Sequence, residues 1–239
     1  MTEFFTLENL MAFLTLATLE IVLGIDNIVF LAITTERLPD EQKPFARRAG
    51  LFLAMLERIL LLSLVSWIAR LRTPFLEFAS FSFSGRDLIL IFGGLFLLFK
   101  STTEMHKLTS GLEEETPHKP SSKKSTMFLV LLQIFLLDTV FSFDSVITAV
   151  GMVDSLLIMI LAVISSVLVM MAFAHPLSEF ILKHPTLKTL ALSFLLLIGV
   201  FLIADGFGKH MEKGYIYFAM FFSAAIEVLN FRMRRKVNK

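Results

Sequence analysis

The stretch Leu156–Ala174 reads LLIMILAVISSVLVMMAFA and contains no charged residue. As an α-helix, a run of about 20 residues rising 1.5 Å per residue matches the roughly 30 Å hydrocarbon core of a bilayer. Similar apolar runs occur at Ile59–Ala69 and Leu88–Phe99. Because a helix pairs its own backbone donors and acceptors, it is a structure that lipid tolerates. The repeated runs predict a protein that crosses the membrane several times.

The composition agrees with this reading and excludes several other classes. Apolar residues make up 56% of the 239 residues, and 26 of them are Phe. A soluble domain would spread its apolar residues in amphipathic stripes rather than in long runs. The absence of cysteine excludes disulfides and thiolate metal sites. No basic patch indicates nucleic-acid binding, and no nucleophile elbow or phosphate-binding glycine loop indicates an enzyme.

We expect an all-α, polytopic membrane helix bundle with about seven transmembrane helices. Proline and glycine punctuate the connections, including His175-Pro176 and His184-Pro185, both of which we place in the fifth connection. The predicted spans cover residues 8–33, 50–69, 87–105, 127–150, 155–174, 188–204 and 215–231.

Basic residues predict the orientation. The first, third and fifth connections and the C-terminal tail carry 16 Lys and Arg residues, whereas the second, fourth and sixth connections carry 5. Short loops rich in Lys and Arg stay in the cytosol. We therefore expect the N-terminus outside and the C-terminus in the cytosol.

The chain divides into two similar halves within one membrane domain, residues 1–239. The first repeat covers about 8–105 and the second about 127–204, with a charged cytosolic linker at about 106–126 and an extra helix at about 215–231. Glu20-Ile-Val-Leu-Gly-Ile-Asp26-Asn27 aligns with Asp138-Thr-Val-Phe-Ser-Phe-Asp144-Ser145. Likewise Gly94-Leu-Phe-Leu-Leu matches Gly199-Val-Phe-Leu-Ile. Three spans per half force the second repeat to enter from the opposite side, so the two repeats are inverted.

Acidic residues within the predicted spans indicate a binding site inside the membrane. A mid-helix Asp costs about 2.5–3.5 kcal/mol on a translocon scale, so something must neutralise these carboxylates. Inverted-repeat transporters bind their substrate near the midplane, where the repeats meet. We therefore predict a midplane cavity and metal site lined by six residues: Glu20, Asp26, Asn27, Asp138, Asp144 and Ser145.

The helical geometry sets a condition on this cavity. Residues seven apart differ by about 20° around a helix, so Glu20 and Asn27 share a stripe. Residues six apart differ by about 120°, so Asp26 and Asp144 point elsewhere on a straight helix. Loosening of the helices at Gly24 and Ser142 would turn both acids of each span to one cavity.

The oxygen ligands favour hard divalent cations such as Mg²⁺, Ca²⁺ and Mn²⁺. The alternative is that the acids bond to neighbouring helices merely to fix their packing. Glu57 and Arg58 lie inside the second span, where adjacent residues do not face each other, so each needs another partner. Arg58 either neutralises a site acid as part of a gate or forms a fixed interhelical ion pair.

The paired acidic motifs, together with Arg86-Asp87-Leu-Ile-Leu-Ile-Phe-Gly-Gly-Leu-Phe, resemble the TerC family of integral membrane proteins along almost the whole chain. The chain is similar to the short form, without the cytosolic regulatory domains fused to some relatives. Members are associated with manganese export across the bacterial inner membrane and with tellurium resistance. The resemblance implies metal-ion efflux, with the six residues above as the matching positions.

The leading hypothesis is therefore an inner-membrane transporter that exports a divalent metal, with Mn²⁺ as the transported ion and no permanently bound cofactor, in exchange for protons. Its partners would be the lipid bilayer and the metal ion. A non-transporting membrane scaffold in envelope or metal and tellurite stress responses is the alternative. Export of a tellurium oxyanion ranks last, because so acidic a site repels an anion.

Overall fold

The computed structural model describes residues 6–64, 74–78, 81–110, 123–153, 155–209 and 213–237. Within these ranges the side chains of residues 25, 26, 74–78, 81, 82, 123–125, 144, 213, 231 and 234–237 are not described, and Asp26 and Asp144 are among them. Seven helices lie in this part of the chain: α1 (Leu7–Thr35), α2 (Lys43–Ser63), α4 (Gly85–Ser110), α5 (Lys123–Met152), α6 (Leu156–Leu182), α7 (Pro185–Gly206) and α8 (Lys213–Val237). Strands β1 (Pro74–Phe78) and β2 (Phe81–Ser84) form an antiparallel hairpin before α4.

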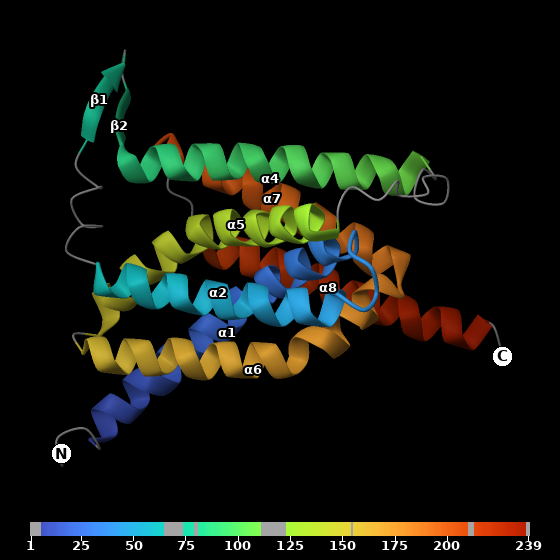
Figure 1. Cartoon of the computed structure of the whole chain (residues 1–239), viewed down its shortest axis with the longest axis horizontal. Coiled ribbons are helices and arrows are strands. Elements are labelled where there is room, and N and C mark those ends of the chain that lie inside the picture. The colour runs from blue at the N-terminus through green and yellow to red at the C-terminus, as the bar shows by residue number, and fades with distance from the viewer. Residues whose placement is uncertain are drawn as a thin grey trace.

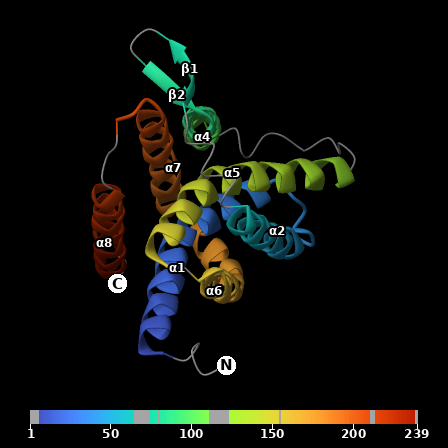
Figure 2. The ribbon, with the colours of Figure 1, turned by 90° about the vertical axis from the view of Figure 1, so that its left-hand side faces the viewer.

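Consecutive helices alternate in direction along the long axis of the molecule (Figure 1). Helices α2, α4 and α6 lie close to this axis, whereas α1, α5, α7 and α8 are inclined to it (Figure 2). Each of the seven expected spans overlaps one of these helices, and residues 65–69 of the second expected span lie outside the described part of the chain. Helices α1, α4, α5, α6 and α7 are long and apolar enough to cross a membrane, and α8 contributes a shorter apolar stretch, Gly214–Asn230. The expected all-α membrane bundle is confirmed.

Helix α2 differs from its neighbours because it carries charges along its length. It packs against α1, α5 and α6, and it buries Arg47, Glu57 and Arg58 against them. These three charges therefore face other helices, which is where ionisable groups in membrane proteins are tolerated.

The helix contacts form a reciprocal pattern. Helix α1 packs on α6 as α2 packs on α5, while α4 packs on α7, α2 on α6 and α1 on α5. Exchanging α1, α2 and α4 for α5, α6 and α7 leaves this set of pairs unchanged. Such a pattern agrees with two copies related by a two-fold axis, although the proposed repeat boundaries remain a prediction.

Helices α4 and α7 make the most extensive contact, and Gly94 and Gly199 lie at its centre. A Cβ on Gly94 would lie 2.6 Å from the carbonyl oxygen of Gly199, and a Cβ on Gly199 would lie 3.0 Å from that of Gly94. The two matched glycines thus face each other, and only glycine lets the backbones come this close.

Several predicted boundaries were wrong. Pro176 lies inside α6, which continues to Leu182, so the fifth connection is limited to Lys183 and His184. Membrane helices tolerate an internal proline, because neighbouring helices and local adjustments satisfy the freed carbonyl. Helix α4 continues to Ser110 and α5 begins at Lys123, which shortens the linker; residues 111–122 lie outside the described part of the chain. The hairpin was not predicted.

The expected loosening of the site helices is also wrong. Helices α1 and α5 are continuous through Gly24 and Ser142. Unbroken helices keep all their backbone hydrogen bonds, so no main-chain carbonyl is released there as a ligand. The ligands of the predicted metal site must therefore all come from side chains.

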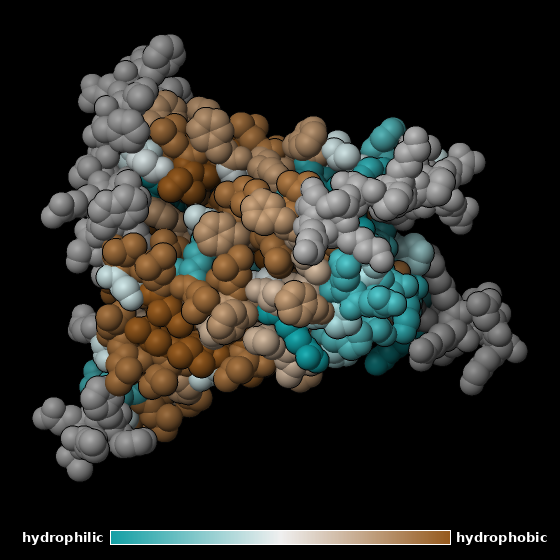
Figure 3. Space-filling view, viewed as in Figure 1, coloured by the Kyte–Doolittle hydropathy of each residue, from teal (hydrophilic) through white to brown (hydrophobic). Residues whose placement is uncertain are grey.

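The surface separates into two zones. Apolar side chains cover most of the face in Figure 3, and hydrophilic residues gather at the end where α1 leads into α2 and where α4 ends. Large apolar residues point outward within the apolar zone, among them Phe92, Phe99, Phe218 and Phe221. In a membrane-spanning protein, such residues meet lipid rather than water.

Candidate functional site: a buried cation between two carboxylates

Arg58 of α2 lies between the two acids that the repeated motif aligns. Its Nη1 donates to Oε2 of Glu20 on α1, and its Nη2 lies 3.2 Å from Oδ1 of Asp138 on α5. All three side chains are buried, with 2%, 5% and 3% of their surface exposed for Arg58, Glu20 and Asp138. Three helices, α1, α2 and α5, therefore meet at one guanidinium.

Asp138 is the most heavily bonded of these residues. Besides Arg58, its Oδ1 accepts a hydrogen bond from Nδ2 of Asn27 at 2.9 Å, and its Oδ2 accepts one from Oγ of Ser142 at 2.8 Å. Asn27 lies two turns from Glu20 on α1, as the stripe argument predicted, and Ser142 lies one turn from Asp138 on α5. These spacings bring the polar groups of two helices to one level.

Two buried groups at the cluster make no hydrogen bond to a described residue: Arg58 Nε and both carboxylate oxygens of Glu57. Thr139 lies beside Glu57, but its hydroxyl donates to the carbonyl of Phe135 at 2.9 Å. Buried polar groups normally have partners. These unpaired atoms leave donors and acceptors at the cluster that a water molecule or a ligand can satisfy.

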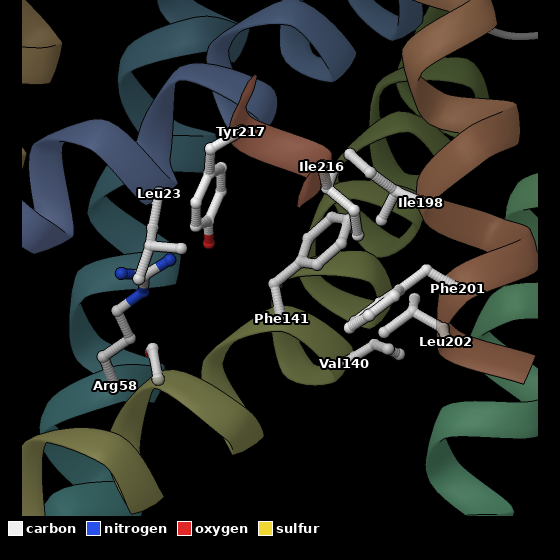
Figure 4. Close-up of a pocket in the computed structure, with 10 residues that line it drawn as sticks. Leu23, Arg58, Val140, Phe141, Ile198, Phe201, Leu202, Ile216 and Tyr217 are labelled. Atoms are coloured by element: carbon white, nitrogen blue, oxygen red, sulfur yellow. The ribbon is translucent and has the colours of Figure 1, made fainter. Parts of the chain in front are cut away.

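A cavity of about 70 Å³ adjoins Arg58 on the side of α7 and α8. Figure 4 shows Tyr217 of α8 directing its hydroxyl into it toward Leu23 and Arg58, with Phe141 and Phe201 across the space. A water molecule requires about 10–15 Å³ of such volume, so the cavity has room for several. On the other side of Asp138, a second void of about 10 Å³ lies beside Asn27 and Gly50.

The structure brings together most of the predicted residues that it describes. Glu20, Asn27 and Asp138 meet at Arg58, and Glu57 lies close enough for its charge to act there. Ser145 is buried, lines the 70 Å³ cavity, and donates to the carbonyl of Ser142 at 3.2 Å.

The side chains of Asp26 and Asp144 lie outside the described residues, so their predicted part in the site stays a prediction. Among the described side chains, no group of three or more His, Cys, Asp or Glu residues is placed to hold a metal ion. The described part of the cluster is thus two acids around an internal cation, with Glu57 nearby.

Sequence reasoning did not include Tyr217 in the site. The residue belongs to α8, outside the repeats, and no local pattern distinguishes it from Tyr215, which is exposed. Ser142 was considered as a point of helix loosening and was not included in the site, although it donates to Asp138. Its position one turn after Asp138 was the signal that would have identified it.

A second polar cluster lies at the hydrophilic end of the bundle. Glu104 of α4 is buried and pairs with Arg37, with Lys100 at 3.5 Å and with Lys107 at 3.5 Å. Next to Arg37, Glu36 pairs with Lys188 of α7 at 2.8 Å. These contacts attach the end of α1 to α4 and α7.

The comparisons with known proteins identify the family of the chain. A model of the integral membrane protein TerC family matches residues 5–239. A UPF0053 protein of Haemophilus influenzae is 51% identical over 229 residues, which cover 95% of each chain. The UPF0053 inner membrane protein YgdQ of Escherichia coli is 50% identical over 223 residues, covering 93% of this chain and 92% of YgdQ.

Other relatives are longer. The UPF0053 inner membrane protein YoaE of Escherichia coli is 50% identical over 222 residues, which are 93% of this chain but 42% of YoaE. The chain thus spans about two fifths of the length of that relative. No solved structure matches the chain. The family match over nearly all residues and the identity of about half to full-length relatives establish that this chain belongs to the TerC family of integral membrane proteins.

Proposed function

We propose that this protein exports a divalent metal cation, with Mn²⁺ as the leading candidate, across the bacterial inner membrane. The observation that carries the proposal is that Glu20 and Asp138, from two repeats, share one positive charge deep in the bundle. Negative charge at that depth requires a cation, and here the cation is a side chain that the protein could exchange for a metal. The names of two relatives state that they are inner membrane proteins.

The donor set suits the proposed substrate. Glu20 and Asp138 supply carboxylate oxygens, Asn27 an amide oxygen and Ser142 and Ser145 hydroxyl oxygens, which are ligands for hard cations such as Mn²⁺ or Mg²⁺. Asp26 and Asp144 complete the set in this proposal as principal ligands. Because carboxylates bind protons as well as metals, proton exchange supplies a driving force without another binding site.

The orientation is part of the proposal. With the N-terminus outside and the C-terminus in the cytosol, the hydrophilic end in Figure 3 faces the cytosol, where the metal enters. The apolar zone occupies the bilayer, and Arg58 lies within it on the buried face of α2.

The test is flux into proteoliposomes that contain the purified full chain. Mn²⁺, Mg²⁺, Ca²⁺ and Zn²⁺ are each supplied with and without a pH gradient. We expect Mn²⁺ flux in the wild type and loss of flux in Asp26→Asn, Asp138→Asn and Asp144→Asn. Asp40→Asn is the matched control, because Asp40 is an exposed acid in the loop between α1 and α2.

A membrane scaffold without transport is the second candidate, and one observation favours it: Arg58 already pairs with both described acids. In that case the cluster fixes the packing of α1, α2 and α5. The scaffold reading expects no flux of any metal under any gradient, together with protein partners that purify with the chain. That outcome would reject the transport proposal.

A further inference from the structure

Arg58 occupies the place that a bound cation requires. Its guanidinium bonds to Glu20 and Asp138, and it is 98% buried, since only 2% of its surface is exposed. A metal that binds the same carboxylates must take lone pairs that now accept hydrogen bonds from Arg58. Like charges at such close range repel strongly in a medium of low dielectric constant. A metal and the guanidinium therefore exclude each other from this position.

The structure also provides a place to which the guanidinium can move. The 70 Å³ cavity begins at Arg58 and is bounded by Phe141, Phe201 and Tyr217 (Figure 4). Aromatic faces attract a guanidinium through cation–π contacts and stacking, and a phenol oxygen accepts a hydrogen bond from it. Arg58 lines this space, and its Nε has no partner among the described residues.

We propose that Arg58 is a tethered counter-cation with two positions, a proposal that rests on the function proposed above. In the metal-free state the guanidinium neutralises Glu20 and Asp138. When a divalent cation binds these carboxylates, the guanidinium moves into the aromatic cavity below Tyr217. Helix α8, which lies outside the two repeats, thereby supplies a wall of the site.

The exchange has a consequence for selectivity. A monovalent cation would replace one positive charge with another and gain no Coulomb energy, whereas a divalent cation doubles the attraction to the two carboxylates. Arg58 therefore discriminates against Na⁺ and K⁺, which are present in excess. Removing its charge lowers the barrier to every cation and weakens the preference for divalent ones.

The first test follows the guanidinium directly. The chain has no cysteine, so Leu202→Cys places a single thiol in the α7 wall of the cavity. We expect added Mn²⁺ to slow the alkylation of this thiol by a cationic thiol reagent severalfold, because the arriving guanidinium fills the cavity and repels the reagent. Leu202→Cys combined with Arg58→Gln should show no slowing. Ser155→Cys, at the start of α6 and away from the cavity, is the control whose labelling stays constant.

The second test measures binding to the purified chain by the loss of the free Mn²⁺ paramagnetic resonance signal. Arg58→Gln should bind Mn²⁺ severalfold more tightly than the wild type, and Na⁺ should compete better in the variant. Arg58→Lys keeps a positive charge at the cluster and replaces Arg58→Gln in this test if that variant does not fold. A single ammonium cannot hold both carboxylates in the guanidinium geometry, so it should also bind Mn²⁺ more tightly than the wild type.

The outcomes separate the two proposals. If the wild type binds no divalent cation and moves none, the proposed function fails and this inference fails with it. If the wild type transports Mn²⁺, but Mn²⁺ slows labelling equally in the presence and absence of Arg58, the exchange is wrong and the transport function stands. Equal Mn²⁺ affinity in the wild type and both Arg58 variants would also overturn the exchange alone.

Discussion

At the scale of single residues, Asp138 is the point on which the buried cluster depends. It accepts hydrogen bonds from Asn27 of α1, Arg58 of α2 and Ser142 of its own helix α5. Charge-assisted hydrogen bonds of this kind are the strong ones in a protein interior, and their loss leaves buried donors without partners. One carboxylate thus connects three helices and, together with Glu20, offsets the positive charge of Arg58.

Replacing this carboxylate should destabilise the protein. We expect Asp138→Asn to lower the free energy of unfolding by about 1–3 kcal/mol. Glu20 still offsets the charge of Arg58, but an amide cannot accept all the hydrogen bonds that the carboxylate receives from Asn27, Arg58 and Ser142, so buried donors lose their partners. Thermal unfolding of the purified chain in detergent measures the effect, with Asp40→Asn as the exposed control. A melting temperature equal to that of the wild type would contradict the structural role of Asp138.

At the scale of helices, the α4–α7 pair relies on close backbone approach. Gly94 and Gly199 face each other at its centre, and Arg86 pairs with Asp205 at 2.6 Å near one end. Without a hydrophobic driving force in lipid, helices associate through such small-residue contacts and through interhelical polar bonds. The association of α4 and α7 therefore depends on the close fit of their backbones as well as on the ion pair between Arg86 and Asp205.

Gly94→Ala should separate α4 from α7. The new Cβ would lie 2.6 Å from a main-chain oxygen, which cannot rotate away as a flexible side chain could. We expect a loss of about 1–3 kcal/mol, the usual cost of overpacking. Gly151→Ala is the matched control, because no atom lies within 4 Å of the added Cβ. Equal melting temperatures for the two variants would refute the close contact.

Glu104 should matter for the attachment of α1 to α4. Its carboxylate pairs with Arg37, Lys100 and Lys107, and its side chain is 8% exposed. Glu104→Gln leaves three cations facing one another, so we expect faster amide hydrogen exchange at the end of α1 and a loss of about 2–3 kcal/mol. Glu179→Gln, whose side chain is 46% exposed in its pair with Lys183, should leave the melting temperature almost unchanged, because solvent screens the pair. The interpretation fails if the two variants behave alike.

At the scale of the whole molecule, the alternating helices place successive connections at opposite ends (Figures 1 and 2). Figure 2 also shows α8 at the edge of the bundle, next to α7, with which it makes its contacts. The hydrophilic end carries the connection between α1 and α2, whereas the turn between α5 and α6 lies at the other end. The chain therefore has two chemically different ends.

Thiol labelling in intact cells can establish which end is outside. In the cysteine-free chain, Ser155→Cys marks the turn before α6 and Glu41→Cys marks the loop before α2. Because the loop before α2 belongs to the Lys- and Arg-rich set, we expect an impermeant reagent to label Ser155→Cys only, and to label Glu41→Cys after the cells are opened. Reversal of this pattern would reject the proposed orientation, and labelling of both from outside would contradict the alternation of the helices.

The sequence alone determined that the chain is a bundle of membrane helices and that acidic residues lie inside α1 and α5. Hydropathy and helical spacing are properties of neighbouring residues, so they can be read along the chain without knowledge of the fold. The same reasoning placed Glu20 and Asn27 on one stripe. It failed at Pro176 and at the expected breaks in α1 and α5, because surrounding helices decide whether a helix continues.

Only the tertiary structure decided which cation meets the acids. Arg58 is 38 residues from Glu20 and 80 from Asp138, and Tyr217 reaches the adjoining cavity from a helix outside the repeats. Such contacts depend on how the helices pack against one another. That packing depends in turn on close contacts between distant residues, such as Gly94 and Gly199. Local sequence shows that a buried charge needs a partner, but only the packing of distant helices selects the partner.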